Sequence, residues 1–223
     1  MKYRCLLFDL DNTLAVSEPL IFASFNHVAQ KYSNRTYSPD EIRSMYGPPE
    51  PGMIVRIVPH QCYDEALKSF YDFYAAHHDE HVRLIPALPP AIKRLHRAGI
   101  RMGVITGKGE RSTEITLRAL GLRQFFGAVV TGEHVQNWKP HPEPAEKALR
   151  ILEAQPSETL FLGDQLADLG CARAAGIDFA AVLWDSFQSD RLLAAGPDMV
   201  FRRPEDFVAW VEENLNRKER QDR

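Results

Sequence analysis

The sequence has few cysteines, no long hydrophobic run and no excess of charge of one sign. Its three cysteines, Cys5, Cys62 and Cys171, lie far apart and form no C-x-x-C pair. That spacing favours a reducing compartment over a disulfide framework or a zinc site. No apolar stretch reaches the roughly 18 residues that a membrane helix needs, and the apolar run near the N-terminus is very short. We therefore expect a cytoplasmic protein with neither a membrane span nor a signal peptide.

The charges nearly balance, since the formal net charge of the 223 residues is −3 at pH 7. Such a chain has no basic field that would hold a phosphate backbone, so we expect no nucleic-acid partner. Hydrophobic residues make up 44% of the chain and charged residues 26%, which is typical of a soluble globular protein and excludes a disordered, collagen-like or coiled-coil chain. The length fits one domain with an insertion, or two small domains.

Short apolar runs recur along the chain and are separated by helical patterns. Helical spacing covers much of the sequence between these runs, and three of the patterns end at a glycine that suits a helix C-terminus. Alternation of strand and helix predicts a parallel sheet covered by helices, so residues 1–14 and 86–223 are expected to form an α/β core with a Rossmann-like sheet. The predicted strands are 5–8, 101–106, 128–130, 160–162 and 180–183, and the predicted helices are 88–98, 110–120, 143–154 and 166–175.

Residues 15–85 have a different composition from the rest of the chain. They hold nearly half of its aromatic residues and no clear strand run, and apolar residues recur at helical spacing over 22–32 and 66–74. Between these patterns lies the proline- and glycine-rich segment 47–52, which we expect to be irregular. We predict a small α-helical domain inserted after the first strand, with the aromatic side chains forming its core rather than stacking on a ligand.

The strongest functional signal follows the first predicted strand, where Asp9 and Asp11 are two residues apart. In extended backbone such residues face the same way, and ligands of open α/β sheets bind at the carboxyl ends of strands. Two carboxylates that lie close together repel each other, and a divalent cation is a natural way to keep one ionised. Asp-Asn is also a common turn pair, so this motif alone does not decide between a site and a turn.

Other predicted strands also run into polar residues. The strand that ends near Ile105 is followed by Thr106, Gly107 and Lys108, whose backbone N–H groups could hold an anion, although the sequence is not a P-loop. The strand at 160–162 runs into Gly163 and two further acids, Asp164 and Asp168, which suit a hard cation. Lys139, in a Lys-Pro pair before a predicted helix, offers a positive charge, although a single lysine is usually a solvated surface residue.

Taken in this order, the motifs resemble those of the haloacid dehalogenase superfamily of phosphohydrolases, most closely its phosphoglycolate phosphatase-like branch. The resemblance covers nearly the whole chain, because the inserted helical domain is similar to the cap domain of that family. It implies a Mg²⁺-dependent phosphatase that hydrolyses a small phosphorylated metabolite, with 2-phosphoglycolate as the best single substrate. The matching residues are Asp9, Asp11 and Thr13 of D-x-D-x-T, the strand-terminal Thr106, Lys139, and Gly163, Asp164 and Asp168 of G-D-x-x-x-D.

The resemblance also implies catalytic roles for the first motif. Asp9 would be the nucleophile that forms an aspartyl-phosphate, and Asp11 would be the general acid for the leaving oxygen and then the general base for water. A dehalogenase lacks the second carboxylate, so Asp11 argues against dehalogenation. Thr13 stands where related sugar-phosphate mutases usually carry valine, which favours hydrolysis over phosphoryl transfer between sugars.

A metal site follows from the same resemblance. Mg²⁺ would be bound by the Asp9 carboxylate, the Asp11 backbone carbonyl and Asp164, and it would screen the repulsion between nucleophile and phosphate. Asp168 would be either an outer ligand of the metal or the residue that positions Lys139.

The transferring phosphoryl group would be bound by Thr106 and Gly107, with Lys139 balancing its charge. The chain departs from the branch at Asn12, where glycine is usual, at Val16, where aspartate is common, and at Gln165, where serine or threonine is typical. None of these departures removes a catalytic group.

The cap contains the residues that we expect to select the substrate. The proline-rich break inside a helical domain motivates the hypothesis that Met45, Tyr46, Gly47 and Glu50 line the leaving-group pocket. The cap would open and close about its two connections to the core, admitting substrate and excluding water.

Two histidine-containing segments have weaker signals. His77 and His81 are four residues apart on one predicted helix, and we expect a solvated helix end there rather than a metal site. His134 and Trp138 precede Lys139 on a loop that should approach the active site. We expect Trp138 to have a packing role and His134 to contact the rim.

Several alternatives stay open from the sequence. The substrate could be pyrophosphate or a nucleoside monophosphate, or the protein could be a sugar-phosphate mutase. A non-catalytic binding protein is disfavoured because Asp9, Asp11 and Asp164 are all present. The chain could be a monomer or a homodimer.

Overall fold

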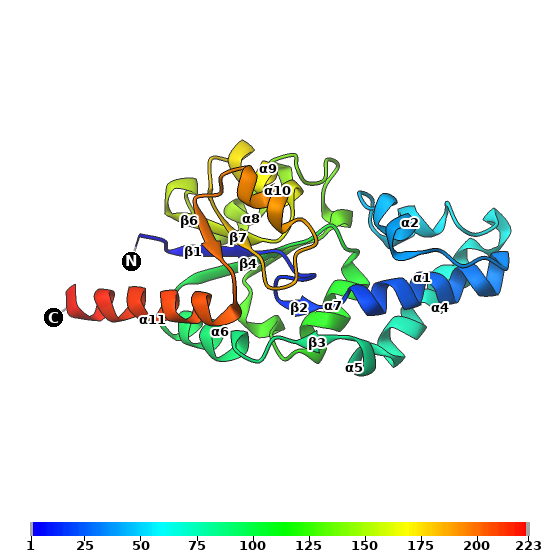
Figure 1. The fold of residues 1–223 in the computed structure, drawn as a ribbon, viewed down its shortest axis with the longest axis horizontal. Helices are drawn as coiled ribbons and strands as arrows, with labels where there is room; N and C mark the ends of the chain where they lie inside the picture. Colours follow the sequence, from blue (N-terminus) through cyan, green and yellow to red (C-terminus); the bar gives the residue numbers. More distant parts are fainter. Residues whose placement is uncertain (1, 222–223) are drawn as a thin grey trace.

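The computed structural model describes the backbone of residues 2–221 and the side chains of residues 2–216. Its centre is a parallel six-stranded sheet, which confirms the predicted α/β fold (Figure 1). Every strand expected from the sequence is present, and the edge strand at Met199–Phe201 was not predicted. The strands in sheet order are β5 (Ala128–Val130), β4 (Arg101–Ile105), β1 (Cys5–Phe8), β6 (Thr159–Gly163), β7 (Asp178–Val182) and β8 (Met199–Phe201).

Helices cover both faces of this sheet (Figure 1). The predicted C-terminal glycines have left-handed backbone, for example Gly99 at φ 72° and Gly121 at φ 65°, where a side chain would be strained. One face carries α6 (Leu88–Arg97), α7 (Glu110–Ala119) and α11 (Pro204–Gln221), and the other carries α8 (Glu143–Leu152), α9 (Leu166–Ala174) and α10 (Ser189–Ala194). Short 3₁₀ turns lie at η1 (His60–Cys62), η2 (Arg123–Phe125), η3 (Gly132–His134) and η4 (Pro156–Glu158).

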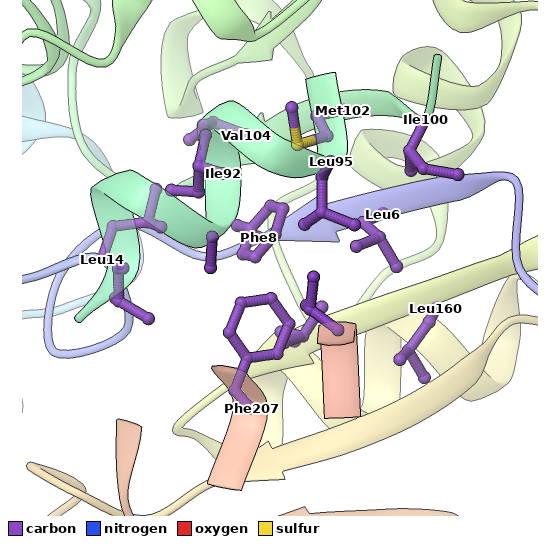
Figure 2. Packing of buried hydrophobic residues seen from close by; sticks show 14 of the residues in the cluster. Leu6, Phe8, Leu14, Ile92, Leu95, Ile100, Met102, Val104, Leu160 and Phe207 are labelled. Atoms are coloured by element: carbon purple, nitrogen blue, oxygen red, sulfur yellow. The ribbon is translucent and has the colours of Figure 1, made fainter. Parts of the chain in front are cut away.

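The central strand β1 shows why the sheet is buried on both faces. Leu6 and Phe8 point into the core that α6 and α11 cover, where Figure 2 shows them beside Leu95 and Phe207. Cys5 and Leu7 point into the core on the opposite face. Because successive side chains of a strand alternate between faces, a strand buried on both sides must be apolar throughout. The residues that follow β1 are therefore attached to a strand that is packed on both faces.

The inserted segment forms a helical domain with its own buried cluster. Its helices, of which Figure 1 shows α1, α2 and α4 grouped at one end of the molecule, are α1 (Glu18–Ser33), α2 (Pro39–Ser44), α3 (Glu50–Ile54), α4 (Tyr63–Ala76) and α5 (His78–His81). At its two connections to the core, β2 (Ala15–Val16) and β3 (Arg83–Leu84) pair as a short antiparallel ribbon. The division into residues 15–85 and the remaining core stays a prediction.

One local expectation was wrong. The segment 47–52 is not irregular throughout, because α3 begins at Glu50. Pro51 lies in the first turn of that helix, where a missing N–H group breaks no helical hydrogen bond. Among the described residues, no helix is both long and apolar enough to span a membrane.

Candidate active site

The polar residues at the strand ends meet at one edge of the sheet. Asp9 follows β1 and its N–H group donates to the carbonyl of Leu162 at 2.9 Å, while the N–H group of Thr106 after β4 donates to Val130 at 2.9 Å. They face a cavity of about 280 Å³ that the core and the helical domain enclose together. Its lining includes Asp9, Asp11, Asn12, Thr106, Gly107, Lys108, Trp138, Lys139 and Gln165 from the core, and Glu18, Ile21, Phe25, Tyr46, Gly47, Pro48, Pro49, Glu50 and Met53 from the inserted domain.

Lys139 joins two buried carboxylates across the site. Its ammonium donates to Asp9 Oδ1 at 2.7 Å and to Asp168 Oδ1 at 2.5 Å, and it lies 3.3 Å from the carbonyl oxygen of Ile105. Burial alone would lower the pKa of Lys139, but the carboxylates of Asp168 and Asp9 outweigh burial and raise it. Lys139 is therefore a permanent cation beside Asp9. Of the two roles open for Asp168, the geometry matches that of positioning Lys139.

Two glycines make this arrangement possible. A Cβ on Gly170 of α9 would lie 2.6 Å from the Cβ of Pro140, so the residue after Lys139 can approach the helix only where no side chain intervenes. A Cβ on Gly163 would lie 2.6 Å from the carboxyl carbon of Asp168. The N–H group of Gln165 also donates to Asp168 Oδ2 at 3.0 Å, which fixes that carboxylate at the start of α9.

Asp164 is a buried acid of the site whose carboxylate oxygens have no hydrogen-bond partner among the described residues. Ligand atoms of Asp9, Asp164 and Asp168 lie within 4.8 Å of one another. Burial, together with the neighbouring Asp9 and Asp168, raises the pKa of Asp164 well above its ordinary value. Buried carboxylates that lack protein partners fit a hard divalent cation such as Mg²⁺.

Asp9, the candidate nucleophile, is also a buried carboxyl group close to other acids. Burial raises the pKa of Asp9 to about 7, Lys139 opposes this shift, and the acids Asp168 and Asp11 add to it. The Asp11 carboxylate does not belong to the acidic group. Its expected metal contact was through the backbone carbonyl, which stays a prediction.

Asp11 instead turns its carboxylate toward a second cation. The Lys108 ammonium lies 3.3 and 3.4 Å from the two Asp11 oxygens, and the Ser17 hydroxyl donates to Asp11 Oδ1. Directly after Asp11, Asn12 has φ 60°, the left-handed conformation that asparagine tolerates better than most residues. This explains why the chain can carry Asn12 where the branch usually has glycine.

The sequence predicts no separate role for the Lys108 side chain and indicates only that the backbone N–H groups after β4 could hold an anion. A usable signal was present, since Lys108 lies three positions beyond the end of β4 (Ile105) and the ends of parallel strands meet at one edge. In that segment, Thr106 is buried and its hydroxyl accepts from the Lys108 N–H group at 3.2 Å, and Gly107 lines the cavity.

The proposed specificity residues of the cap differ in where they lie. Tyr46, Gly47 and Glu50 line the cavity, whereas Met45 packs against the buried cluster of the cap. The Glu50 carboxylate also bonds to the core, because it accepts from the N–H group of Gly109 and from the hydroxyl of Ser112. Their role in choosing the substrate stays a prediction.

The histidine segments and Trp138 form no second site among the described residues. The rings of His77 and His81 stack 6.2 Å apart, and neither belongs to a group that could hold a metal. Trp138 is 38% exposed and lines the cavity, and its indole N–H group donates to the carbonyl of Gly132 at 3.0 Å. The packing role expected for Trp138 stays a prediction. The His134 ring accepts from the Thr131 N–H group at 3.2 Å.

Comparison with known proteins shows the family. The family model described as haloacid dehalogenase-like hydrolase matches residues 6–182. Pyrophosphatase PpaX of Anoxybacillus flavithermus is 33% identical over 209 residues, which cover 94% of this chain and 97% of that protein. The chain therefore belongs to the haloacid dehalogenase-like hydrolases.

Solved structures agree with this assignment. CbbY from Rhodobacter sphaeroides in complex with phosphate has a TM-score of 0.78 at 25% identity, covering 91% of this chain and 95% of that one. A predicted phosphoglycolate phosphatase from Haemophilus somnus has a TM-score of 0.80 at 20% identity, covering 94% and 98%. The second likeness shows the fold alone.

Proposed function

We propose that this haloacid dehalogenase-like hydrolase is a Mg²⁺-dependent phosphohydrolase that acts through an aspartyl-phosphate on Asp9, with pyrophosphate as its substrate. The observation that carries the proposal is the buried Asp9 carboxylate, bonded to Lys139 and grouped with Asp164, whose oxygens have no hydrogen-bond partner among the described residues. Pyrophosphate is preferred because the relative that matches nearly the full length is named a pyrophosphatase. 2-Phosphoglycolate is the second candidate, since it is also small enough for a cavity of about 280 Å³.

The proposed reaction has two displacements. An Asp9 oxygen forms a bond to phosphorus while the bond from phosphorus to the leaving oxygen breaks, and Asp11 supplies the proton that this oxygen takes up. Water then attacks the phosphorus of the aspartyl-phosphate, Asp11 accepts a proton from that water, and inorganic phosphate leaves Asp9. The sum is the addition of one water to the substrate.

The remaining residues bind and neutralise the transferring group. Thr106 and the Gly107 backbone would bind its oxygens, and Lys139 would balance their charge. Asp9 and Asp164, with the Asp11 carbonyl, would hold Mg²⁺. When bound, Mg²⁺ screens the repulsion between the anionic nucleophile and the anionic phosphate.

Phosphate release from a substrate panel tests this proposal. The panel holds pyrophosphate, 2-phosphoglycolate, nucleoside monophosphates, sugar phosphates and p-nitrophenyl phosphate, each with Mg²⁺ and with EDTA. We expect release only with Mg²⁺, fastest from pyrophosphate, and a loss of at least about 1,000-fold in Asp9→Asn. Asp79→Asn is the matched control, because that side chain is 99% exposed. Absence of release from every compound by the folded wild-type protein would overturn the proposal.

A further inference from the structure

Lys108 is a buried cation in the cavity that the proposed chemistry does not use. Its side chain is 3% exposed, and of the described residues that line the cavity only Lys108 and Lys139 are cations. Lys139 is already engaged by Asp9 and Asp168 at 2.7 and 2.5 Å. Burying an ammonium group costs free energy unless an opposite charge lies close to it. Lys108 has one such partner, Asp11, at 3.3 Å.

Contacts from both domains fix the position of the Lys108 ammonium. It lies 3.3 and 3.4 Å from the Asp11 oxygens and 4.9 Å from the ring centroid of Tyr74, whose hydroxyl is bonded to Thr116 at 2.8 Å. Burial alone would lower the pKa of Lys108, but Asp11, Tyr74 and Glu50 outweigh burial and raise it. The group is therefore a fixed and permanent positive charge.

Its position is on the leaving-group side of the site. In the proposed reaction the phosphoryl group transfers to Asp9, and the departing oxygen lies at Asp11. Lys139 bonds to Asp9 and Lys108 bonds to Asp11, so the two cations serve opposite ends of the substrate. An ammonium in contact with the Asp11 carboxylate is within reach of the atoms that leave.

The acids near Lys108 in the cap are already partnered. Glu18 is bonded to the Arg43 guanidinium at 2.7 and 3.0 Å. Glu50 accepts from Gly109 and Ser112, and burial, opposed by Lys108, raises its pKa. Of the acids that line this side of the cavity, only Asp11 contacts Lys108 within 4.0 Å among the described residues.

We propose that Lys108 binds a negative charge carried by the leaving group and so selects substrates whose leaving portion is itself an anion. The distal phosphate of pyrophosphate and the carboxylate of 2-phosphoglycolate share this chemistry, whereas sugars and nucleosides leave as neutral alcohols. The inference rests on the proposed function, because the location of the leaving group depends on the roles of Asp9 and Asp11. Ile21, Phe25 and Met53 also line the cavity, and a contact between opposite charges is stronger beside apolar side chains than in water.

The test compares pairs of substrates, one with an anionic and one with a neutral leaving group. Wild type, Lys108→Met and Lys108→Arg are assayed with pyrophosphate against methyl phosphate, and with 2-phosphoglycolate against 2-hydroxyethyl phosphate. In Lys108→Met we expect kcat/KM for both anionic substrates to fall about 30- to 100-fold, at least ten times more than for their neutral partners. Lys108→Arg should restore part of the selectivity. Lys68→Met is the matched control, because Lys68 is a 74% exposed cap lysine.

The loss of kcat/KM in Lys108→Met shows whether Lys108 contacts the leaving group. Selective loss with both anionic substrates supports the proposal, and loss with one of them identifies which anion the site recognises. An equal loss with charged and neutral substrates would overturn it, because Lys108 would then only position Asp11. Unchanged kcat/KM for both anionic substrates in Lys108→Met would overturn it as well.

A binding measurement separates this inference from the proposed function. Calorimetry with the Asp9→Asn protein compares methylenediphosphonate with methylphosphonate, with and without Lys108→Met, in the presence of Mg²⁺. We expect Lys108→Met to weaken methylenediphosphonate at least about tenfold more than methylphosphonate. Equal weakening refutes the role of Lys108 even if the enzyme hydrolyses phosphate esters. Selective weakening supports that role even if no panel substrate is turned over. Melting temperatures confirm that each variant is folded.

Discussion

The core and the inserted helical domain, the predicted cap, line one cavity with different kinds of side chain. The core contributes carboxylates and lysines placed at strand ends and fixed by short ion pairs, as in the chain Asp9, Lys139 and Asp168. The cap contributes mainly apolar side chains. Hydrogen bonds such as those from Gly109 and Ser112 to the Glu50 carboxylate connect it to the core. We conclude that changes to the core residues around Asp9 should alter the rate with every substrate, whereas changes to Lys108 and to the cap should alter selectivity.

After that of Asp9→Asn, the largest expected effect is that of removing Asp164, the acid of the core that has no hydrogen-bond partner among the described residues. Asp164→Asn should lower kcat at least about 100-fold with every substrate, because the residue that would hold the metal loses its charge. The same change should raise the melting temperature of the metal-free protein, since a buried carboxylate without a partner costs free energy. Thermal unfolding with and without Mg²⁺ measures both effects. A Mg²⁺-induced shift as large as in wild type would contradict the assignment.

The pH dependence of stability also tests whether a metal ion binds at Asp9 and Asp164. In the metal-free protein, burial raises the pKa of Asp9 from 3.8 to about 7. The stability due to its protonated form is complete below about pH 4 and is lost as the pH rises through 7. Stabilisation by Mg²⁺ should therefore be greater at pH 8 than at pH 5.5. Urea unfolding at both pH values checks this, and an equal Mg²⁺ effect at both would count against a metal bound at Asp9 and Asp164.

A smaller effect is expected where the cap meets the core. Glu50→Ala leaves the buried Gly109 N–H group without its acceptor and removes one of the two acceptors of the Ser112 hydroxyl, and we expect kcat/KM to fall about 10- to 100-fold. Glu50→Gln should restore part of the loss, and Ser112→Ala should add little to Glu50→Ala because both remove one interaction. Steady-state kinetics across the panel measures this. Unchanged relative rates in Glu50→Ala and Tyr46→Ala would exclude these two residues from substrate selection.

Sequence reasoning succeeded where local pattern and sheet geometry suffice. Asp9, Thr106 and Asp164 each follow an apolar run, and the rule that parallel strands end at one edge brought them together correctly. The place of Lys108 just after β4 brings it to the same edge of the sheet, but its pairing with Asp11, 97 positions away, depends on side-chain packing that the sequence pattern does not encode. Glu50 was expected in the cavity, but its bonds to the core depend on how the two domains close, which no periodicity encodes.

Two short elements were missed for a similar reason. Strand β8 has three residues, two of them half-buried, and it lies beyond the last strand and helix that the sequence pattern predicts. Helix α3 begins inside a segment rich in proline and glycine, where composition favours a loop but the first helical turn tolerates proline. Both are decided by tertiary packing rather than by local preference.

The smallest expected effect concerns an exposed contact between the domains. The Arg43 guanidinium of the cap lies 5.0 Å from the ring of Phe187 in the core and 5.0 Å from the ring of Phe22 in the cap. Phe187 is 45% exposed, so the contact is weakly desolvated, and Phe187→Ala should raise KM about two- to threefold without changing kcat. Ile151→Ala is the control, since Ile151 is 51% exposed and does not line the cavity. A change in kcat, or an equal change in KM in the control, would mean that this contact does not act through closure of the cap.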